Sequence, residues 1–211
     1  MSTMNLKKLK HAEKIFFESY PGGFYHPDML AMAKKHKMDK IILFTQESFE
    51  KENFKSPDDI LDNFAKVINR STMVSMFEKP KFKDFVKSLN PDEKELLVNG
   101  LKNQLHGEEQ EGFEIMLEFL RSRRLAKWPL MTACPVYFRP QAEVFVKPTT
   151  VKGVIEFFEL KSLQYKPAPT WAFYEEYRSI IKEMKSNLDP CLYPNNAAFS
   201  GFLMMSLENK N

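Results

Sequence analysis

Residues 127–177 read KWPLMTACPVYFRPQAEVFVKPTTVKGVIEFFELKSLQYKPAPTWAFYEEY, and this segment holds both tryptophans and six of the thirteen prolines. Pro129, Pro135 and Pro140 interrupt a run that is still strongly apolar. A proline inside a helix removes one backbone hydrogen bond and clashes with the preceding turn. The prolines therefore predict a buried or half-buried loop in place of a continuous helix.

Two short runs in the same segment are rich in β-prone side chains. Residues 144–146 and 163–165 are predicted to pair as a two-stranded ribbon beside a helix at 150–159. The predicted fold class is therefore all-α, mainly helical, with a small irregular or two-stranded β element in the proline-rich region 127–170.

The rest of the chain has helical periodicity, because apolar residues recur every three to four positions between polar ones. Helices are predicted at 3–19, 72–78 and 108–124, at a short stretch within 82–89, and from starts at 27, 39, 57, 91 and 171. Thr170 is the predicted cap of the helix that starts at 171, and Asn195 or Asn196 is the predicted cap of the last helix. We expect a single domain, with a helical frame at 1–125, a proline-rich cap at 126–170 and C-terminal helices at 171–211 that pack on the frame.

Two of these helices begin with the same device, Ser56-Pro57-Asp58-Asp59 and Asn90-Pro91-Asp92-Glu93. A polar side chain at the cap accepts a hydrogen bond from a free backbone N–H, and proline fits the first helical position. Two carboxylates then face the positive end of the helix. This pattern predicts helix starts at both places.

Charge and hydropathy exclude several classes of protein. The chain has 31 basic and 28 acidic residues, a net charge of +3, so its overall charge does not call for nucleic acid or membrane. The first residues lack the features of a secretory signal, and the most apolar run, 197–207, is far shorter than the roughly 20 residues that span a bilayer. We expect a cytoplasmic protein without a membrane partner.

No metal or cofactor is expected. Cys134 and Cys191 lie far apart and are predicted to be reduced, buried thiols, and the four histidines lack the spacing of a zinc site. The chain contains no glycine-rich phosphate loop and no serine elbow. The sequence therefore carries no signature of a known catalytic mechanism.

The run at 77–85, FEKPKFKDF, interleaves basic and aromatic residues. Such a surface stacks bases and neutralises phosphates in proteins that bind single strands. Phe82 and Phe85, however, have the spacing of a buried helix face, which leaves the lysines on a solvated face. Nucleic acid is therefore a partner that the sequence allows but does not favour.

Five short motifs follow one another along the chain: Pro21-Gly22-Gly23-Phe24, Phe77-Glu78-Lys79, Trp128-Pro129, Phe145-Val146-Lys147-Pro148 and Trp171-x-x-Tyr174. In their order and spacing they resemble a family of uncharacterised bacterial cytoplasmic proteins with no assigned activity. The resemblance implies that Arg70, Glu78, Lys79, Asp84 and Lys147 belong together. They would form either a buried ion-pair network that stabilises the packing or a functional site.

A second candidate site is the helix that is expected to begin after Pro148. Free N–H groups at a helix start attract anions, and Thr149 and Thr150 with Lys147 and Lys152 would complete a cradle for phosphate or carboxylate. Alternatively, the two threonines only cap the helix. The candidate binding residues are Arg70, Glu78, Lys79, Asp84, Lys147, Thr149, Thr150, Lys152, Trp128 and Trp171.

Two functions are compatible with these residues. The first is a non-enzymatic cytosolic binding or adaptor protein for an anionic or protein partner. The alternative is an enzyme that acts on a phosphate-containing or nucleic-acid substrate, with Glu78 or Asp84 as acid or base and Arg70, Lys79 or Lys147 stabilising charge. The absence of a recognised nucleophile or metal set favours the first.

Overall fold

The computed structural model describes residues 4–208, and within this range the chain forms helices and connecting turns but no strand. The α-helices are α1 (Leu6–Ser19), α2 (Pro27–Lys35), α3 (Met38–Ser48), α4 (Pro57–Arg70), α5 (Glu78–Lys87), α6 (Pro91–His106), α7 (Glu109–Ser122), α8 (Trp128–Phe138), α9 (Pro148–Phe157), α10 (Trp171–Ser186) and α11 (Asn196–Glu208). Three short 3₁₀ helices are η1 (Gly23–Tyr25), η2 (Lys51–Lys55) and η3 (Pro190–Leu192).

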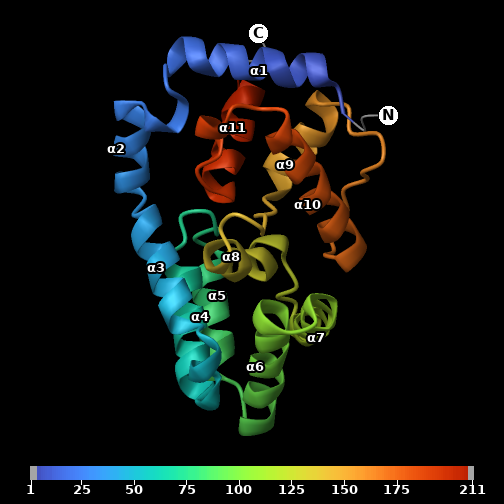
Figure 1. Ribbon diagram of the computed structural model, residues 1–211. Coiled ribbons are helices and arrows are strands. Elements are labelled where there is room, and N and C mark those ends of the chain that lie inside the picture. The colour runs from blue at the N-terminus through green and yellow to red at the C-terminus, as the bar shows by residue number, and fades with distance from the viewer. Residues whose placement is uncertain (1–3, 209–211) are drawn as a thin grey trace.

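The helices form two groups with α8 between them (Figure 1). One group contains α4, α5, α6 and α7, and the other contains α9, α10 and α11 with α1 lying across its end. Helices α2 and α3 run along one side and connect α1 to α4 (Figure 1). Helix α8 contacts members of both groups, including α4, α6 and α11.

Helix α8 replaces the loop that the prolines predict, so that prediction is wrong. Pro129 lies in the first turn, where a helix has no backbone hydrogen bond to lose, and only Pro135 lies inside the helix. An interior proline costs about 3 kcal/mol or more, whereas each fully buried large apolar side chain contributes about 1.5–3 kcal/mol. Every residue from Trp128 to Tyr137 is buried, so burial outweighs the proline.

The predicted β ribbon is absent from the described residues, and the all-helical model corrects that part of the fold class. Residues 144–146 are buried, and the N–H groups of Val144 and Val146 face side-chain oxygens and not a second strand. The Val146 N–H donates to Thr132 Oγ1 at 3.1 Å, and the Val144 N–H lies 3.5 Å from the Tyr174 hydroxyl. Because these two N–H groups face side chains, they do not form a β ladder with residues 163–165.

The predicted helix at 72–78 is also wrong. Residues 72–77 form turns and bends, and α5 begins at Glu78 and continues through Pro80. Pro80 occupies the third position of the helix, where the backbone N–H has no intrahelical acceptor, so it does not stop the helix. The irregular segment before α5 leaves Met76 and Phe77 about three-quarters exposed, at 74% and 75%.

The two predicted caps differ. Asn90 accepts a hydrogen bond from the Glu93 N–H at 3.0 Å, and the Glu93 carboxylate accepts one from the Asn90 N–H, which completes a capping box. Helix α4 starts at Pro57 as predicted, but the Ser56 side chain makes no capping hydrogen bond. The structure also confirms Thr170 and Asn195 as caps, because they accept hydrogen bonds from the third backbone N–H beyond them.

The two cysteines are free, as predicted, but only Cys134 is fully buried. Among residues 4–208, no helix combines the length and the apolar character needed to cross a membrane.

Candidate functional site

A groove of about 860 Å³ lies where the first residues of α5, α8 and α9 meet. Two irregular segments complete its walls, one at 72–76 and one around Tyr165 and Pro167. The residues along it that carry charge, a hydroxyl group or an indole are Thr72, Ser75, Glu78, Lys79, Lys127, Trp128, Lys147, Thr149, Lys152 and Tyr165. We refer to this feature as the lysine groove.

Three helix starts contribute to the lysine groove, and none of them is capped by a side chain. Helices α5, α8 and α9 begin at Glu78, Trp128 and Pro148, and the residue before each start makes no capping hydrogen bond. The first N–H groups of a helix have no intrahelical acceptor and form the positive end of its dipole. In α5, however, the Glu78 and Lys79 N–H groups donate to the Ser75 carbonyl oxygen and Pro80 has no N–H, so α8 and α9 are the starts that offer free N–H groups. The alternative in which Thr149 or Thr150 caps α9 is not observed.

Four lysines reach the lysine groove, namely Lys79, Lys127, Lys147 and Lys152. Within residues 4–208 none of the four ammonium groups belongs to an ion pair, although the Lys152 Nζ lies 5.1 Å from the centre of the Tyr165 ring. Elsewhere in the described range, Lys8, Lys10, Lys14 and Lys94 belong to ion pairs, for example Lys94 with Asp58 at 2.6 Å, and the other lysines do not. The groove therefore concentrates positive charge that no protein carboxylate neutralises except that of Glu78.

Glu78 brings the single carboxylate of the lysine groove. Burial raises the pKa of Glu78, and the nearby Lys127 and Lys81 partly oppose this shift. Its Oε2 atom is buried and has no hydrogen-bond partner among the described residues. A carboxylate in this state takes up a proton, or accepts a hydrogen bond from a ligand, more readily than a solvated one.

Trp128 is part of the wall of the lysine groove and is held in one position. Its side chain is 1% exposed, and its indole N–H donates to the Lys166 carbonyl oxygen at 2.9 Å. Its ring centre lies 5.3 Å from that of Phe173. The indole is therefore a fixed optical probe next to the four lysines.

The structure brings six of the ten predicted site residues to the lysine groove and places the other four elsewhere. Arg70 stacks on Phe44, with its guanidinium carbon 4.3 Å from the ring centre. Asp84 is exposed on α5, and Trp171 packs against Phe113 at 5.6 Å between ring centres. Thr150 is 7% exposed and lines a neighbouring apolar pocket instead.

The structure contains a buried ion-pair network, but its members are not the residues that the sequence suggested. Glu143, whose side chain is 3% exposed, pairs with Arg139 at 2.8 Å and with Arg178 at 3.1 Å. Glu109 pairs with the same two arginines at 2.6 and 2.8 Å. No two of Arg70, Glu78, Lys79, Asp84 and Lys147 form an ion pair within the described range.

Sequence reasoning missed Lys127 in the lysine groove. It precedes Trp128-Pro129, a pattern typical of a helix start, but the surrounding prolines favoured a loop. Thr72 and Ser75 were missed because they were placed inside a predicted helix. The signal that identifies all three residues is their position at or before a helix start, which only the correct helix boundaries reveal.

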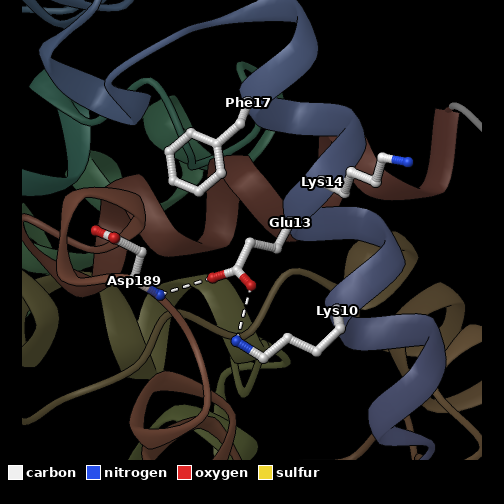
Figure 2. Close-up of a pocket in the computed structure, with 5 residues that line it drawn as sticks. All are labelled: Lys10, Glu13, Lys14, Phe17 and Asp189. Carbon is white, nitrogen blue, oxygen red and sulfur yellow. Dashed lines mark hydrogen bonds and ion pairs between the residues drawn. The ribbon is translucent and has the colours of Figure 1, made fainter.

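A second polar pocket, of about 420 Å³, lies between α1 and the start of η3 (Figure 2). Glu13 points into it and accepts hydrogen bonds from the Asp189 N–H at 2.7 Å and from the Lys10 ammonium at 2.8 Å. Lys14 points away from these groups (Figure 2). Because Glu13 already joins α1 to the C-terminal segment, its role is explained by the packing.

Neither thiols nor metal ligands gather in the part of the chain that is described. Residues 4–208 contain no group of three or more histidine, cysteine, aspartate or glutamate side chains arranged to hold a metal. Burial raises the pKa of the Cys134 thiol, and burial together with Asp189 raises the pKa of Cys191 to about 11. Both shifts favour the unreactive thiol form.

Comparison with protein-family models, with curated proteins and with solved structures finds no match to this chain.

Proposed function

We propose that this protein binds the anionic group of a ligand or partner in the lysine groove and acts as a binding or adaptor protein, not as an enzyme. The observation that supports the proposal is that three helix starts without side-chain caps, two of them with free N–H groups, meet at one groove with four lysines that belong to no ion pair in the described range. Each helix start and each lysine favours negative charge. A bacterial cytoplasmic setting, which the sequence resemblance implies, is part of the same proposal.

The ligand is proposed to carry phosphate or carboxylate. The hydroxyl groups of Thr72, Ser75 and Thr149 supply donors that suit the oxygens of either group. A nucleic-acid strand is less favoured, because Phe82 and Phe85 of the basic run are buried, at 0% and 6% exposure, and so do not stack on bases.

Titration of the purified protein tests the proposal. Phosphate, tripolyphosphate and citrate would be added while tryptophan emission is followed, and binding would be confirmed by calorimetry. A Trp171→Phe variant assigns the signal to Trp128, the tryptophan that lines the groove. We expect saturable binding of at least one of these anions that weakens as salt increases, since binding depends on charge.

The variant Lys147→Gln/Lys152→Gln should weaken this binding by tenfold or more, about 1.4 kcal/mol. The matched control Lys87→Gln/Lys182→Gln removes the same charge from two exposed lysines outside the groove. It should bind as the wild type does. Equal losses in both variants would show that only the net charge matters, and flat titrations of the wild type would refute the proposal.

One observation keeps an enzymatic function as the second candidate. Among the described residues, Glu78 is the only carboxylate that lines the lysine groove, and burial raises its pKa, the direction of shift that suits a carboxylate acting as acid or base. No histidine or cysteine lines the groove, and Asp84, the other predicted acid or base, lies outside it. The test is whether the purified protein releases phosphate from phosphate esters. If Glu78→Gln abolishes this release while binding is retained, the enzymatic function is established in place of the first.

A further inference from the structure

An apolar pocket of about 360 Å³ lies beside the lysine groove. Its walls come from the junction of α2 and α3, from α11 and the loop before it, and from Met73 and Phe145. The volume falls within the range of about 300–1,000 Å³ that is common for small-molecule sites. It is the apolar counterpart of the lysine groove, and we refer to it as the methionine pocket because Met29, Met32, Met38, Met73 and Met204 line it.

The mouth of the methionine pocket is apolar. Nine large hydrophobic side chains within residues 4–208 are exposed, and four of them, Tyr25, Leu30, Met32 and Met204, line this pocket. Single exposed hydrophobic residues need no explanation, but a cluster of them at a concave site marks a place where an apolar group binds. Flexible methionine side chains suit a ligand whose shape is not fixed.

The methionine pocket and the lysine groove share a wall. Thr72, Met73 and Lys147 line both of them. Lys147 is exposed, precedes the uncapped start of α9, and has no ion-pair or hydrogen-bond partner for its ammonium group within the described residues. A ligand lying in the apolar pocket can therefore present one end to this lysine and to the free N–H groups of α9.

The geometry points to a small amphiphile as the ligand, with one unbranched aliphatic chain in the methionine pocket and an anionic head group at Lys147 and the start of α9. This inference rests on the proposed function and names the class of ligand. The titratable groups that line the pocket are Lys147, which precedes α9, Tyr25 from η1, and His36 and Asp39 from the α2–α3 junction, so the lysine charge lies at the end shared with the lysine groove.

An aliphatic chain fits the methionine pocket better than a peptide does. A peptide carries backbone N–H and C=O groups that need partners when they leave water. Two polar side chains of the pocket already use their oxygens internally, since Asn195 accepts from the Ala198 N–H at 2.8 Å and Ser200 donates to the Asn196 carbonyl at 3.0 Å. A hydrocarbon chain has no such groups to satisfy.

Calorimetric titration with dodecyl phosphate and dodecanoate, each below its critical micelle concentration, and with inorganic phosphate tests the inference. We expect dodecyl phosphate to bind at least about tenfold more tightly than inorganic phosphate, and octyl phosphate to bind at least about tenfold more weakly than dodecyl phosphate, because each buried methylene adds to the affinity. Dodecyl phosphate and dodecanoate show whether the site prefers a phosphate or a carboxylate head. Binding of either dodecyl phosphate or dodecanoate at least about tenfold more tightly than inorganic phosphate supports the inference.

Gly201 gives a variant that fills the methionine pocket. It lines the pocket in α11, and a Cβ atom there would meet only Phe24, at 3.9 Å, so Gly201→Ala should fold and bind dodecyl phosphate normally. Gly201→Leu should reduce dodecyl phosphate binding by at least about tenfold while leaving inorganic phosphate binding unchanged. The control Ala172→Leu adds the same side chain at an exposed position of α10 outside the pocket. Circular dichroism checks that every variant is folded.

The outcomes separate this inference from the proposed function. If inorganic phosphate binds and the dodecyl chain adds no affinity, the amphiphile is refuted and the anion-binding function stands. If none of phosphate, tripolyphosphate, citrate, dodecyl phosphate and dodecanoate binds, both are refuted. The inference would also be refuted if the wild type and folded Gly201→Leu bound dodecyl phosphate equally. It would be refuted as well if the wild type formed a dimer that Gly201→Leu abolished.

Discussion

The Tyr174 hydroxyl donates a 2.5 Å hydrogen bond to the Glu143 carboxylate, and the two residues as a whole are 1% and 2% exposed. Burial raises the pKa of Tyr174 well above its usual value, and the adjacent Glu143 raises it further, so the phenol keeps the proton that it donates. Arg139 and Arg178 pair with the same carboxylate. This cluster connects the end of α8 to α10, and Glu109 extends it to α7.

Glu143→Ala should lower the free energy of unfolding by about 1–3 kcal/mol, because it leaves the buried Tyr174 phenol without its acceptor, while Arg139 and Arg178 keep their ion pairs with Glu109. Urea denaturation followed by circular dichroism measures the change. Asp84→Ala removes an exposed carboxylate from α5 and serves as the control, with an expected change within about 0.5 kcal/mol. A loss below about 1 kcal/mol for Glu143→Ala would contradict the network that the structure shows.

Substitution by alanine should change the stability of the protein in opposite directions at two helical glycines. A Cβ atom on Gly112 would lie 2.1 Å from the Gln104 backbone nitrogen, because α7 crosses α6 there. Gly112→Ala should therefore destabilise the protein by at least about 3 kcal/mol, the upper end of the usual cost of overpacking. Gly201→Ala has room for its Cβ and should raise stability by up to about 1 kcal/mol through helix propensity. Thermal melts compare the two, and similar losses in both would argue against the close crossing of α6 and α7.

The two predicted caps provide a matched pair of substitutions. Asn90→Ala removes the capping box of α6 and should cost about 1 kcal/mol. Ser56→Ala should cost distinctly less, because the Ser56 side chain makes no capping hydrogen bond. Urea denaturation of the two variants side by side measures the difference. Equal losses would mean that Ser56 caps α4 in solution.

The raised pKa of Glu78 predicts that neutralising this carboxylate stabilises the folded protein, by an amount that depends on pH. The folded protein holds this proton more tightly than the unfolded chain does, so stability falls as pH rises from the ordinary carboxyl pKa of about 4.3 through the raised folded value. Glu78→Gln removes the titration. Its melting temperature should exceed that of the wild type at about pH 7, and the difference should shrink below about pH 4.

The control for this prediction is Asp84→Asn, which neutralises an exposed carboxylate of the same helix. It should not produce the gain at about pH 7, since the side chain is not desolvated. A melting temperature of Glu78→Gln that lies below that of the wild type at neutral pH would show that the carboxylate is stabilised by its lysines and not penalised by burial.

The sequence by itself determined where most helices lie. Helical periodicity and local signals at Pro27, Pro57, Asn90 and Thr170 act over a few residues, so they are visible without the fold. The chemistry of a helix start selected Lys147, Thr149 and Lys152 of the lysine groove, because lysines and threonines at such a start favour anions wherever that helix packs. The other three predicted residues of the groove, Glu78, Lys79 and Trp128, were selected by the resemblance of the short motifs.

Only the tertiary structure decided that residues 128–138 form a helix and that residues 144–146 do not join a sheet. Proline opposes a helix locally, but burial of the whole of α8 against both groups of helices outweighs that cost. The Val146 N–H found its acceptor in Thr132. Packing also chose Glu143 as the centre of the ion-pair network and brought three helix starts to one groove, because these contacts join residues far apart in the chain and leave no local pattern in the sequence.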